Sequence, residues 1–419
     1  MTPGSGVGSG DTVAGLLAEI GDIGLDPVRG GYSRPVLSTA ELDLREWFLA
    51  HAGKRGLDVE TDRNGVLWAW HAPSGSRDGA VVTGSHLDSV PGGGAYDGPL
   101  GVASALVAFD RLAARGVGGA DAPARAIAVF PEEEGSRFGV ACLGSRLMAG
   151  AITPERALGL RDADGTTYAD ALRASGADPR HVGVDRDALG RIGAFVELHV
   201  EQGRGLVDLD QPVAIGSSIL GHGRWRVSIA GVGNHAGTTL MADRRDPMVA
   251  AAQLVLAVQR LARAVPDARA TVGRLVPVPG GTNVIASRVD LWLDVRHPDD
   301  ATTLGLVEQV RHAADAAAAE QGCTAALTEE SFSATVDFDA ALRDELRGVL
   351  PEAPVLATGA GHDAGVLKEH VPTAMLFVRN PSGVSHAPEE HAEDADAEAG
   401  AEALAAALEH LLTRRTRGL

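Results

Sequence analysis

Cysteine, basic residues and long apolar runs are all scarce in this sequence. The only two cysteines, Cys142 and Cys323, are too few for a disulfide framework and favour a reducing compartment. The 37 lysines and arginines face 56 acidic residues, and the net charge of −19 argues against nucleic-acid binding, which requires a basic surface. No apolar run approaches the roughly 20 residues of a membrane-spanning helix, and residues 1–10 lack the basic start and apolar core of a signal peptide. We therefore expect a soluble cytoplasmic protein that binds neither nucleic acid nor membrane.

The composition is that of a globular protein with more than one compact unit. Hydrophobic residues make up 45% of the sequence and charged residues 22%, which are ordinary values for a folded chain. A length of 419 residues exceeds that of one typical domain. Two compact units are therefore the natural expectation.

Short apolar runs and helical repeats alternate along most of the chain. The apolar runs predict strands at residues 66–70, 80–83, 126–130, 195–200 and 374–378. Helical spacing predicts helices at residues 39–51, 102–112 and 394–412. Between residues 217 and 330 the order becomes strand, helix, two strands and helix, which is typical of a ferredoxin-like inserted domain. We expect an α/β protein whose larger domain, residues 1–216 and 331–419, has a mixed sheet flanked by helices and is interrupted by a smaller α+β domain, residues 217–330.

One loop concentrates residue types that bind metal ions. It follows the predicted strand at residues 80–83 and contains His86 and Asp97. Residues 92–95 are all glycine or alanine, small enough for the loop to fold back and bring His86 and Asp97 to one ion. Imidazole and carboxylate are ligands that Zn²⁺-type ions prefer. For this loop alone, an ordinary ion pair is an equally good interpretation.

Ionisable residues also lie at the ends of three other predicted strands. Residues 132–134 are consecutive glutamates after one strand, His199 ends another, and His386 lies in the loop beyond a third. Taken singly, these are a solvated turn, a histidine satisfied at a sheet edge and a loop residue. Chemistry in open α/β sheets gathers at the carboxyl ends of the strands, so the four strand ends together favour a metal site.

Several motifs resemble those of a known family, and they occur in the family's order. They are Gly84-Ser85-His86-Leu87-Asp88, Asp97-Gly98, Glu133-Glu134-Gly135-Ser136-Arg137-Phe138, Glu197-Leu198-His199-Val200-Glu201-Gln202-Gly203, Asn234-His235-Ala236-Gly237-Thr238-Thr239 and Gly383-Val384-Ser385-His386. They are similar to the hydantoinase/carbamoylase branch of the di-zinc aminoacylase–carboxypeptidase superfamily. That branch includes N-carbamoyl-L-amino acid hydrolases, β-ureidopropionases and allantoate amidohydrolases.

The resemblance implies two divalent metal ions per subunit. Zinc is the first expectation, and manganese, cobalt or nickel would suit the same ligands. Asp97 would bridge the two ions. His86 and His199 would complete one site, and Glu134 and His386 would complete the other.

The same resemblance implies three catalytic roles. Asp88 would hold the second ring nitrogen of His86 and fix its tautomer. Glu133 would be the general base that activates water. His235 would stabilise the oxyanion from across a dimer. The base is placed at Glu133 because the family's base and ligand are the two glutamates directly before the glycine, and a slip of one residue toward Glu132 is left open.

The substrate implied is a small ureido compound. Its carboxylate would contact Arg296, whose guanidinium matches a carboxylate in bidentate geometry, and Asn283. Gln202 is a weaker candidate for the substrate's polar end. Three histidines have no assigned role: His222, His362 and His391. The small residues around His362 would let a ligand approach it.

The leading interpretation is hydrolysis of the carbamoyl C–N bond of an N-carbamoyl-L-amino acid to the L-amino acid, ammonia and carbon dioxide. Allantoate amidohydrolase or β-ureidopropionase is the nearest alternative. A metallopeptidase or N-acyl-amino acid hydrolase comes next, and a non-catalytic binding relative is the alternative from another class. We also expect a homodimer, because His235 would reach the neighbour's site. The inserted domain would act as both the lid and the dimerisation domain.

Overall fold

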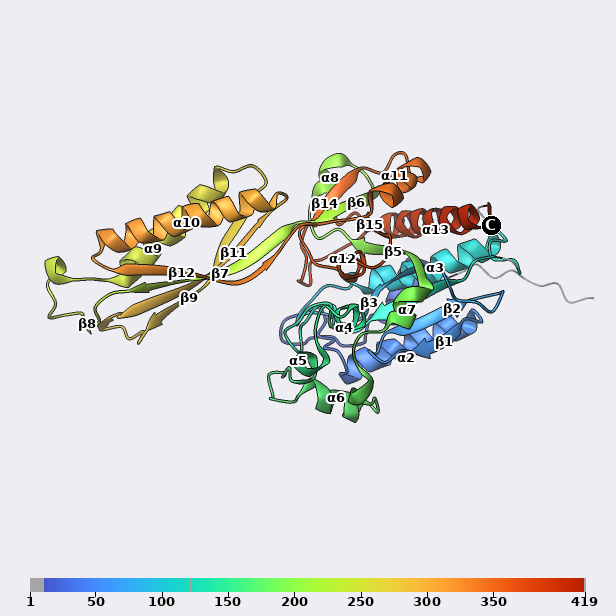
Figure 1. The fold of residues 1–419 in the computed structure, drawn as a ribbon, viewed down its shortest axis with the longest axis horizontal. Helices are drawn as coiled ribbons and strands as arrows, with labels where there is room; N and C mark the ends of the chain where they lie inside the picture. Colours follow the sequence, from blue (N-terminus) through green and yellow to red (C-terminus); the bar gives the residue numbers. More distant parts are fainter. Residues whose placement is uncertain (1–10, 121, 418–419) are drawn as a thin grey trace, which may run out of the picture. The chain divides into compact units, whose positions relative to one another are not determined.

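The chain folds into two compact units, each with its own sheet and core. The computed structural model describes residues 11–120 and 122–417, and Figure 1 shows its helices and strands. The first unit comprises Met1–Ser217 and Asp337–Leu419, and the second comprises Ser218–Val336. The first has a nine-stranded sheet and the second a separate four-stranded one. The predicted fold class, an α/β protein with a mixed sheet and an inserted α+β domain, is confirmed.

A mixed sheet forms the centre of the first unit. Its strands follow the order β1-β2-β4-β3-β5-β15-β6-β13, and β14 pairs with β6. The four central strands β4, β3, β5 and β15 are parallel, whereas β2 runs antiparallel to β1 and β4, and β6 runs antiparallel to β15. The bounds are β1 Asp58–Thr61, β2 Leu67–His71, β3 Ala80–His86, β4 Arg125–Phe130, β5 Ile192–Val200, β6 Val213–Ile219, β13 Val336–Asp337, β14 Val355–Thr358 and β15 Thr373–Val378.

Helices cover the central strands, and every residue of β3, β4 and β15 is buried. α3 (Pro99–Ala114) and α13 (Asp394–Arg417) pack against each other and against β3, β5 and β15 (Figure 1). The unit's remaining helices are α1 Val13–Glu19, α2 Thr39–Lys54, α4 Leu143–Ala149, α5 Pro154–Leu158, α6 Tyr168–Ala174, α7 Arg186–Arg191, α8 Gly205–Leu209, α11 Ala340–Val349 and α12 Asp363–Leu367, with 3₁₀ turn η1 at Pro179–His181. Over the described ranges, every helix is too short or too polar to span a bilayer.

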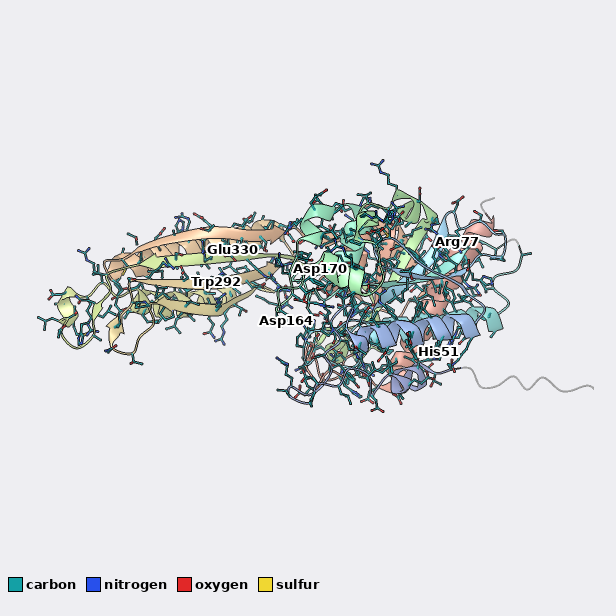
Figure 2. All side chains as sticks on the ribbon, turned by 90° about the horizontal axis from the view of Figure 1, so that it is seen from below. His51, Arg77, Asp164, Asp170, Trp292 and Glu330 are labelled. Atoms are coloured by element: carbon teal, nitrogen blue, oxygen red, sulfur yellow. The ribbon has the colours of Figure 1, made fainter. Side chains whose placement is uncertain are left out.

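The second unit has the order β-α-β-β-α-β around an antiparallel sheet, β12-β7-β11-β9. The dipeptide Asp246-Pro247 predicts the start of a helix, and α9 begins there, because Asp246 caps it and Pro247 is its first residue. The side chains that alternate away from the core include Trp292, whose indole N–H donates to Glu330 Oε1 at 3.2 Å (Figure 2). The bounds are β7 Gly221–Ala230, β8 Asn234–His235, η2 Met241–Asp243, α9 Pro247–Arg263, β9 Arg269–Val278, β10 Val284–Ile285, β11 Arg288–His297, α10 Asp300–Glu320 and β12 Thr324–Ser333.

The register of the parallel strands brings two histidines to one level of the large sheet. Gly84 of β3 pairs with Glu197 of β5. His86 and His199 each lie two residues further along, so they share one level and one face of the sheet. The loops after β3, β4 and β15 leave from the same edge, and residues 88–97, 132–134 and 386 can therefore gather there.

Candidate active site

Three buried side chains meet at the carboxyl ends of β3 and β5. His86 Nε2 lies 3.3 Å from Asp97 Oδ1, and His199 Nε2 lies 3.2 Å from the same oxygen. The two imidazole nitrogens are 3.5 Å apart. All three residues are at most 3% exposed. Two imidazoles and one carboxylate that converge in this way form a donor set suited to a divalent cation.

A second group of three shares Asp97 with the first. His386 Nε2 lies 3.5 Å from Asp97 Oδ2 and 3.3 Å from Glu134 Oε2. Within each group the ligand atoms lie within 4.8 Å of one another. The two groups contact different oxygens of the Asp97 carboxylate, which is the arrangement a bridging ligand needs. The structure thus brings all five sequence-predicted ligands together, in the two predicted sets.

The charges around Asp97 suit bound cations. In the described part of the chain, the ion-pair partners of Asp97, Glu133 and Glu134 are histidines, and none is a lysine or arginine. Burial raises the pKa of Glu134 to about 8, and it raises the pKa of Glu133 well above its usual range; neighbouring carboxylates add to both shifts. Burial alone would lower the pKa of His86, but Glu133 and Asp97 hold it well above its usual range. Buried carboxylates this close together favour bound positive charge, which divalent ions supply.

Hydrogen bonds to the backbone orient both histidine rings. His86 Nδ1 lies 3.0 Å from the carbonyl oxygen of Asp88 and 3.7 Å from the Asp88 carboxylate. His199 Nδ1 lies 3.0 Å from the carbonyl oxygen of Val200. If each Nδ1 carries the ring proton and donates a hydrogen bond to the carbonyl oxygen, the lone pair of each Nε2 is free to bind an ion. The partner of His86 is therefore the carbonyl of Asp88, whereas the sequence pointed to its carboxylate.

The Asp88 carboxylate instead holds the loop after β4. Its two oxygens accept the backbone N–H groups of Glu133 at 3.1 Å and Glu134 at 3.2 Å. The loop is tied from the other side by helix α4, because the N–H of Cys142 donates to the carbonyl of Glu133 at 2.7 Å and that of Leu143 to the carbonyl of Glu132 at 3.1 Å. The start of a helix leaves such N–H groups without partners in the helix itself. Both ends of this short loop are thus fixed.

The three consecutive glutamates point in different directions. Glu132 has a φ of 55°, and its Oε1 accepts the backbone N–H groups of Arg137 and Phe138 at 3.0 and 2.6 Å. It therefore lies in neither ligand group. Glu133 Oε2 lies 3.7 Å from His86 Nε2, outside the ligand sets but beside them, and Glu134 belongs to the second set. This geometry favours Glu133 as base and Glu134 as ligand over a one-residue slip.

Glycine is required where the ligand loop turns into α3. Gly98 has a φ of 85°, and a Cβ there would lie 2.6 Å from the ring of His86. Its neighbour Asp97 is thereby brought against the imidazole. On the opposite side, Gln202 Nε2 donates to Asp97 Oδ2 at 2.9 Å and to Ser385 Oγ at 3.1 Å. Gln202 therefore contacts the shared carboxylate and the loop of His386, a position that its sequence motif alone did not reveal.

His362 is an additional site residue to which the sequence assigned no role. It is 3% exposed, its ring centre lies 4.5 Å from that of His199, and its Nδ1 lies 3.8 Å from Glu133 Oε1. Neither ring nitrogen has a hydrogen-bond partner among the described residues. Burial holds the pKa of His362 well below its usual range, so the ring is neutral. The available signal was its neighbourhood, since residues 359–361 are glycine or alanine.

The second unit holds the remaining predicted residues, and it does not bring all three together. His235 in β8 pairs with Val284 in β10, and the carbonyl of Asn283 accepts the N–H of Ala236, so His235 and Asn283 are neighbours. Arg296 lies near the other end of β11, where its guanidinium forms a bidentate pair with Asp294 at 2.8 and 3.1 Å. Arg296 pairs with His222 on the neighbouring strand β7, and the other end of this strand pair is at Ala230. The eight-residue step from His222 to Ala230 spans about 26 Å at the rise of a strand.

Comparison with known proteins places this geometry in a family. The model of peptidase family M20/M25/M40 matches residues 82–410. The chain belongs to the M20 peptidase family. It is 35% identical over 392 residues to the N-carbamoyl-L-amino acid amidohydrolase of Geobacillus stearothermophilus, a match that covers 93% of this chain and 95% of the relative. It is 34% identical over 420 residues to a probable allantoate deiminase of Oryza sativa subsp. japonica, covering 91% of this chain and 84% of the relative.

A solved structure gives the same assignment. The amidase of the hydantoinase/carbamoylase family from Burkholderia multivorans superposes with a TM-score of 0.83 at 32% sequence identity, over 96% of this chain and 97% of that one. Within the M20 family, the chain thus belongs to the hydantoinase/carbamoylase branch, as its motifs predicted. It is a metal-dependent amidohydrolase that acts on carbon–nitrogen bonds other than peptide bonds.

Proposed function

We propose that this M20 enzyme hydrolyses the carbamoyl C–N bond of N-carbamoyl-L-amino acids. The supporting observation is the pair of ligand groups that share Asp97, with the buried carboxyl of Glu133 beside them. One divalent ion would be held by His86, Asp97 and His199, and a second by Asp97, Glu134 and His386. Zinc is the first candidate, and manganese, cobalt and nickel accept the same donors. Such ions, when bound, polarise a carbonyl oxygen and lower the pKa of water.

Glu133 performs the proton transfers in this proposal. Its carboxylate takes a proton from the attacking water as the water oxygen bonds to the carbamoyl carbon. The C–N bond to the terminal amino group then breaks, and Glu133 returns the proton to that nitrogen, which leaves as ammonia. The remaining carbamate loses carbon dioxide and releases the L-amino acid. Burial raises the pKa of Glu133, which suits a group that must hold a proton between the two steps.

His362 is suited to orient the substrate beside this base. Its neutral ring offers one donor and one acceptor, and it lies between His199 and Glu133. A ureido group presents both a carbonyl oxygen and N–H groups, so it can satisfy a ring whose nitrogens have no hydrogen-bond partner among the described residues. In this role His362 would hold the carbamoyl carbon near the water that Glu133 activates.

The positions within the second unit support a dimeric site. His235 Nδ1 accepts the N–H groups of Gly237 and Thr238 at 3.0 and 3.2 Å, which places the proton of the neutral ring on Nε2 as a donor. If His235, Asn283 and Arg296 all contact one small substrate, they cannot come from a single copy of this unit, because about 26 Å of strand separates its ends. A homodimer in which His235 and Asn283 serve the neighbour's site resolves this. A substrate carboxylate would then replace Asp294 as the partner of Arg296.

Allantoate is the second candidate substrate. Its ureido group offers the same reacting bond, and sequence identity hardly distinguishes the two classes, at 35% to the carbamoylase and 34% to the rice allantoate enzyme. The test is ammonia release by metal-loaded protein from N-carbamoyl-L-amino acids, their D-enantiomers, N-carbamoyl-β-alanine and allantoate. We expect the highest kcat/KM for an N-carbamoyl-L-amino acid. A higher kcat/KM for allantoate would correct the substrate and keep the mechanism, whereas no ammonia from any of them would refute the proposal.

A further inference from the structure

Glu390 connects the two loops that carry Asp97 and His386. It lies four residues after His386 in the loop before α13 and is 4% exposed. Its Oε1 accepts the backbone N–H of Asp97 at 2.8 Å and that of Tyr96 at 3.1 Å. The Glu390 carboxylate thus holds the backbone of Asp97, the shared ligand. Glu390 itself lies in the loop that supplies His386 to the second group.

The fit around this carboxylate is tight. A Cβ at Gly94 would lie 2.3 Å from Glu390 Oε1 and 2.5 Å from Glu390 Cβ. Gly94 does not have a positive φ, so the backbone shape does not explain the glycine. The close approach of Glu390 does. The loop that carries Asp97 therefore packs closely against the Glu390 side chain.

The loop of His386 needs such an outside contact. His386 has a φ of 59°, in the left-handed region that residues other than glycine rarely adopt, and its side chain is 49% exposed. By contrast, His86 and His199 are held within β3 and β5. In the second ligand group His386 is thus placed by a loop and not by a strand, and the group's geometry depends on how the two loops are held together.

We infer that Glu390 is a positioning residue that sets the separation between His386 and Asp97, and so determines whether the second group retains its ion. This inference rests on the proposed two-ion site. Glu390 touches the backbone of a ligand and not the reacting atoms. Loss of an outer partner of a metal ligand typically weakens metal binding about 10- to 100-fold. We expect that loss for the ion of the second group, while the ion held by His86 and His199 stays bound.

The test measures bound metal, not only activity. Wild type, Glu390→Ala, Glu390→Gln and Glu389→Ala are loaded with zinc and dialysed, and zinc per chain and zinc affinity are determined. Glu389 is the exposed neighbour and serves as the matched control. We expect Glu390→Ala to lose one of two ions, and Glu389→Ala to keep both. Glu390→Gln should also keep both, because its amide oxygen can still accept from Asp97 and Tyr96.

Gly94→Ala provides an independent arm that leaves Glu390 in place. The added methyl group should displace the carboxylate and weaken the same ion, and it should add no further loss to Glu390→Ala, because both changes break one contact. Circular dichroism of the metal-free proteins checks that each variant folds, and Gly94→Ala carries the test if Glu390→Ala does not. Two tightly bound ions in every variant would overturn the inference alone. A wild type that binds no ion would overturn the proposed function instead.

Discussion

Replacing Glu133 by glutamine should remove catalysis while leaving the metal groups in place. The variant keeps the size of the side chain, and the backbone of residue 133 stays fixed by the Asp88 carboxylate and by the N–H of Cys142. Among the described residues, the polar groups near the carboxyl group are the thiol of Cys142 at 3.7 Å, His86 Nε2 at 3.7 Å and His362 Nδ1 at 3.8 Å, so no strong hydrogen bond is lost. The change therefore isolates the acid–base role.

The expected size follows from the lack of a substitute. General acid–base catalysis contributes about 10²- to 10⁴-fold, equivalent to about 3–5 kcal/mol at 1.36 kcal/mol per tenfold. We expect the upper part of that range, about 10³-fold or more in kcat. Glu132 accepts hydrogen bonds within its own loop, and Glu134 belongs to the second candidate ligand group, so neither can replace the base. KM and the number of bound ions should stay near wild type, since glutamine removes neither a ligand nor a substrate contact.

Folding stability gives this variant a second readout. The pKa of Glu133 is raised in the folded protein, mainly by burial. Its contribution to stability is therefore complete below the pKa of the unfolded chain and is lost as the pH rises toward the folded value. At neutral pH the metal-free variant should melt no lower than metal-free wild type, because it no longer buries this carboxyl group.

The assay is steady-state ammonia release with metal content determined on the same samples. Glu132→Gln is the matched control, because its amide oxygen can still accept the N–H groups of Arg137 and Phe138. It should retain nearly full kcat. A Glu133→Gln enzyme within about tenfold of wild type, below the range of a general base, would refute the reasoning. The reasoning would also be refuted if Glu132→Gln were inactive and Glu133→Gln active.

The remaining predictions concern the ligands, the dimer and pH. Asp97→Asn should lose both ions, whereas His386→Ala should lose one, as metal analysis after dialysis would show; equal losses would contradict a shared carboxylate. Mixing His235→Ala with Glu133→Gln protein should restore part of the activity through heterodimers, and no recovery despite proven subunit exchange would exclude a cross-subunit role. Zinc affinity should rise with pH through about 8, the pKa of Glu134, because protons and metal compete for the ligands; an affinity independent of pH would contradict this.

The strands of the large sheet could be predicted from sequence because each depends on a pattern of residues that are adjacent in the chain. β3, β4, β5 and β15 are short apolar runs, and the candidate ligands lie either at the ends of these strands or in the loops that follow them. Because the carboxyl ends of parallel strands share one edge of the sheet, the sequence predicted that these residues meet there. α9 was equally local, because its cap and its first proline are adjacent in sequence. These features need no knowledge of distant contacts.

Other features depended on contacts that no local pattern encodes. The small residues before His362 hinted that a ligand could approach it, but its place in the site follows from its packing against His199. The pairing of Glu390 with Asp97 joins residues 293 positions apart. Arg296 and Asn283 are predicted to contact one carboxylate, and this stays a prediction: Arg296 lies on β11 of the four-stranded sheet, whereas Asn283 precedes β10 of a separate two-stranded sheet. Chain separation and register decided each of these, and neither is visible in a motif.

The most direct test of the account is to titrate metal-free protein with zinc and follow both bound metal and ammonia release from an N-carbamoyl-L-amino acid. The shared carboxylate of Asp97 makes both ligand groups parts of one site. We predict no hydrolysis without metal, binding of two ions per chain, and activity that is complete only when both are bound. Ammonia release by the metal-free protein, or a fully zinc-loaded protein that remains inactive on every ureido substrate, would contradict the central claim.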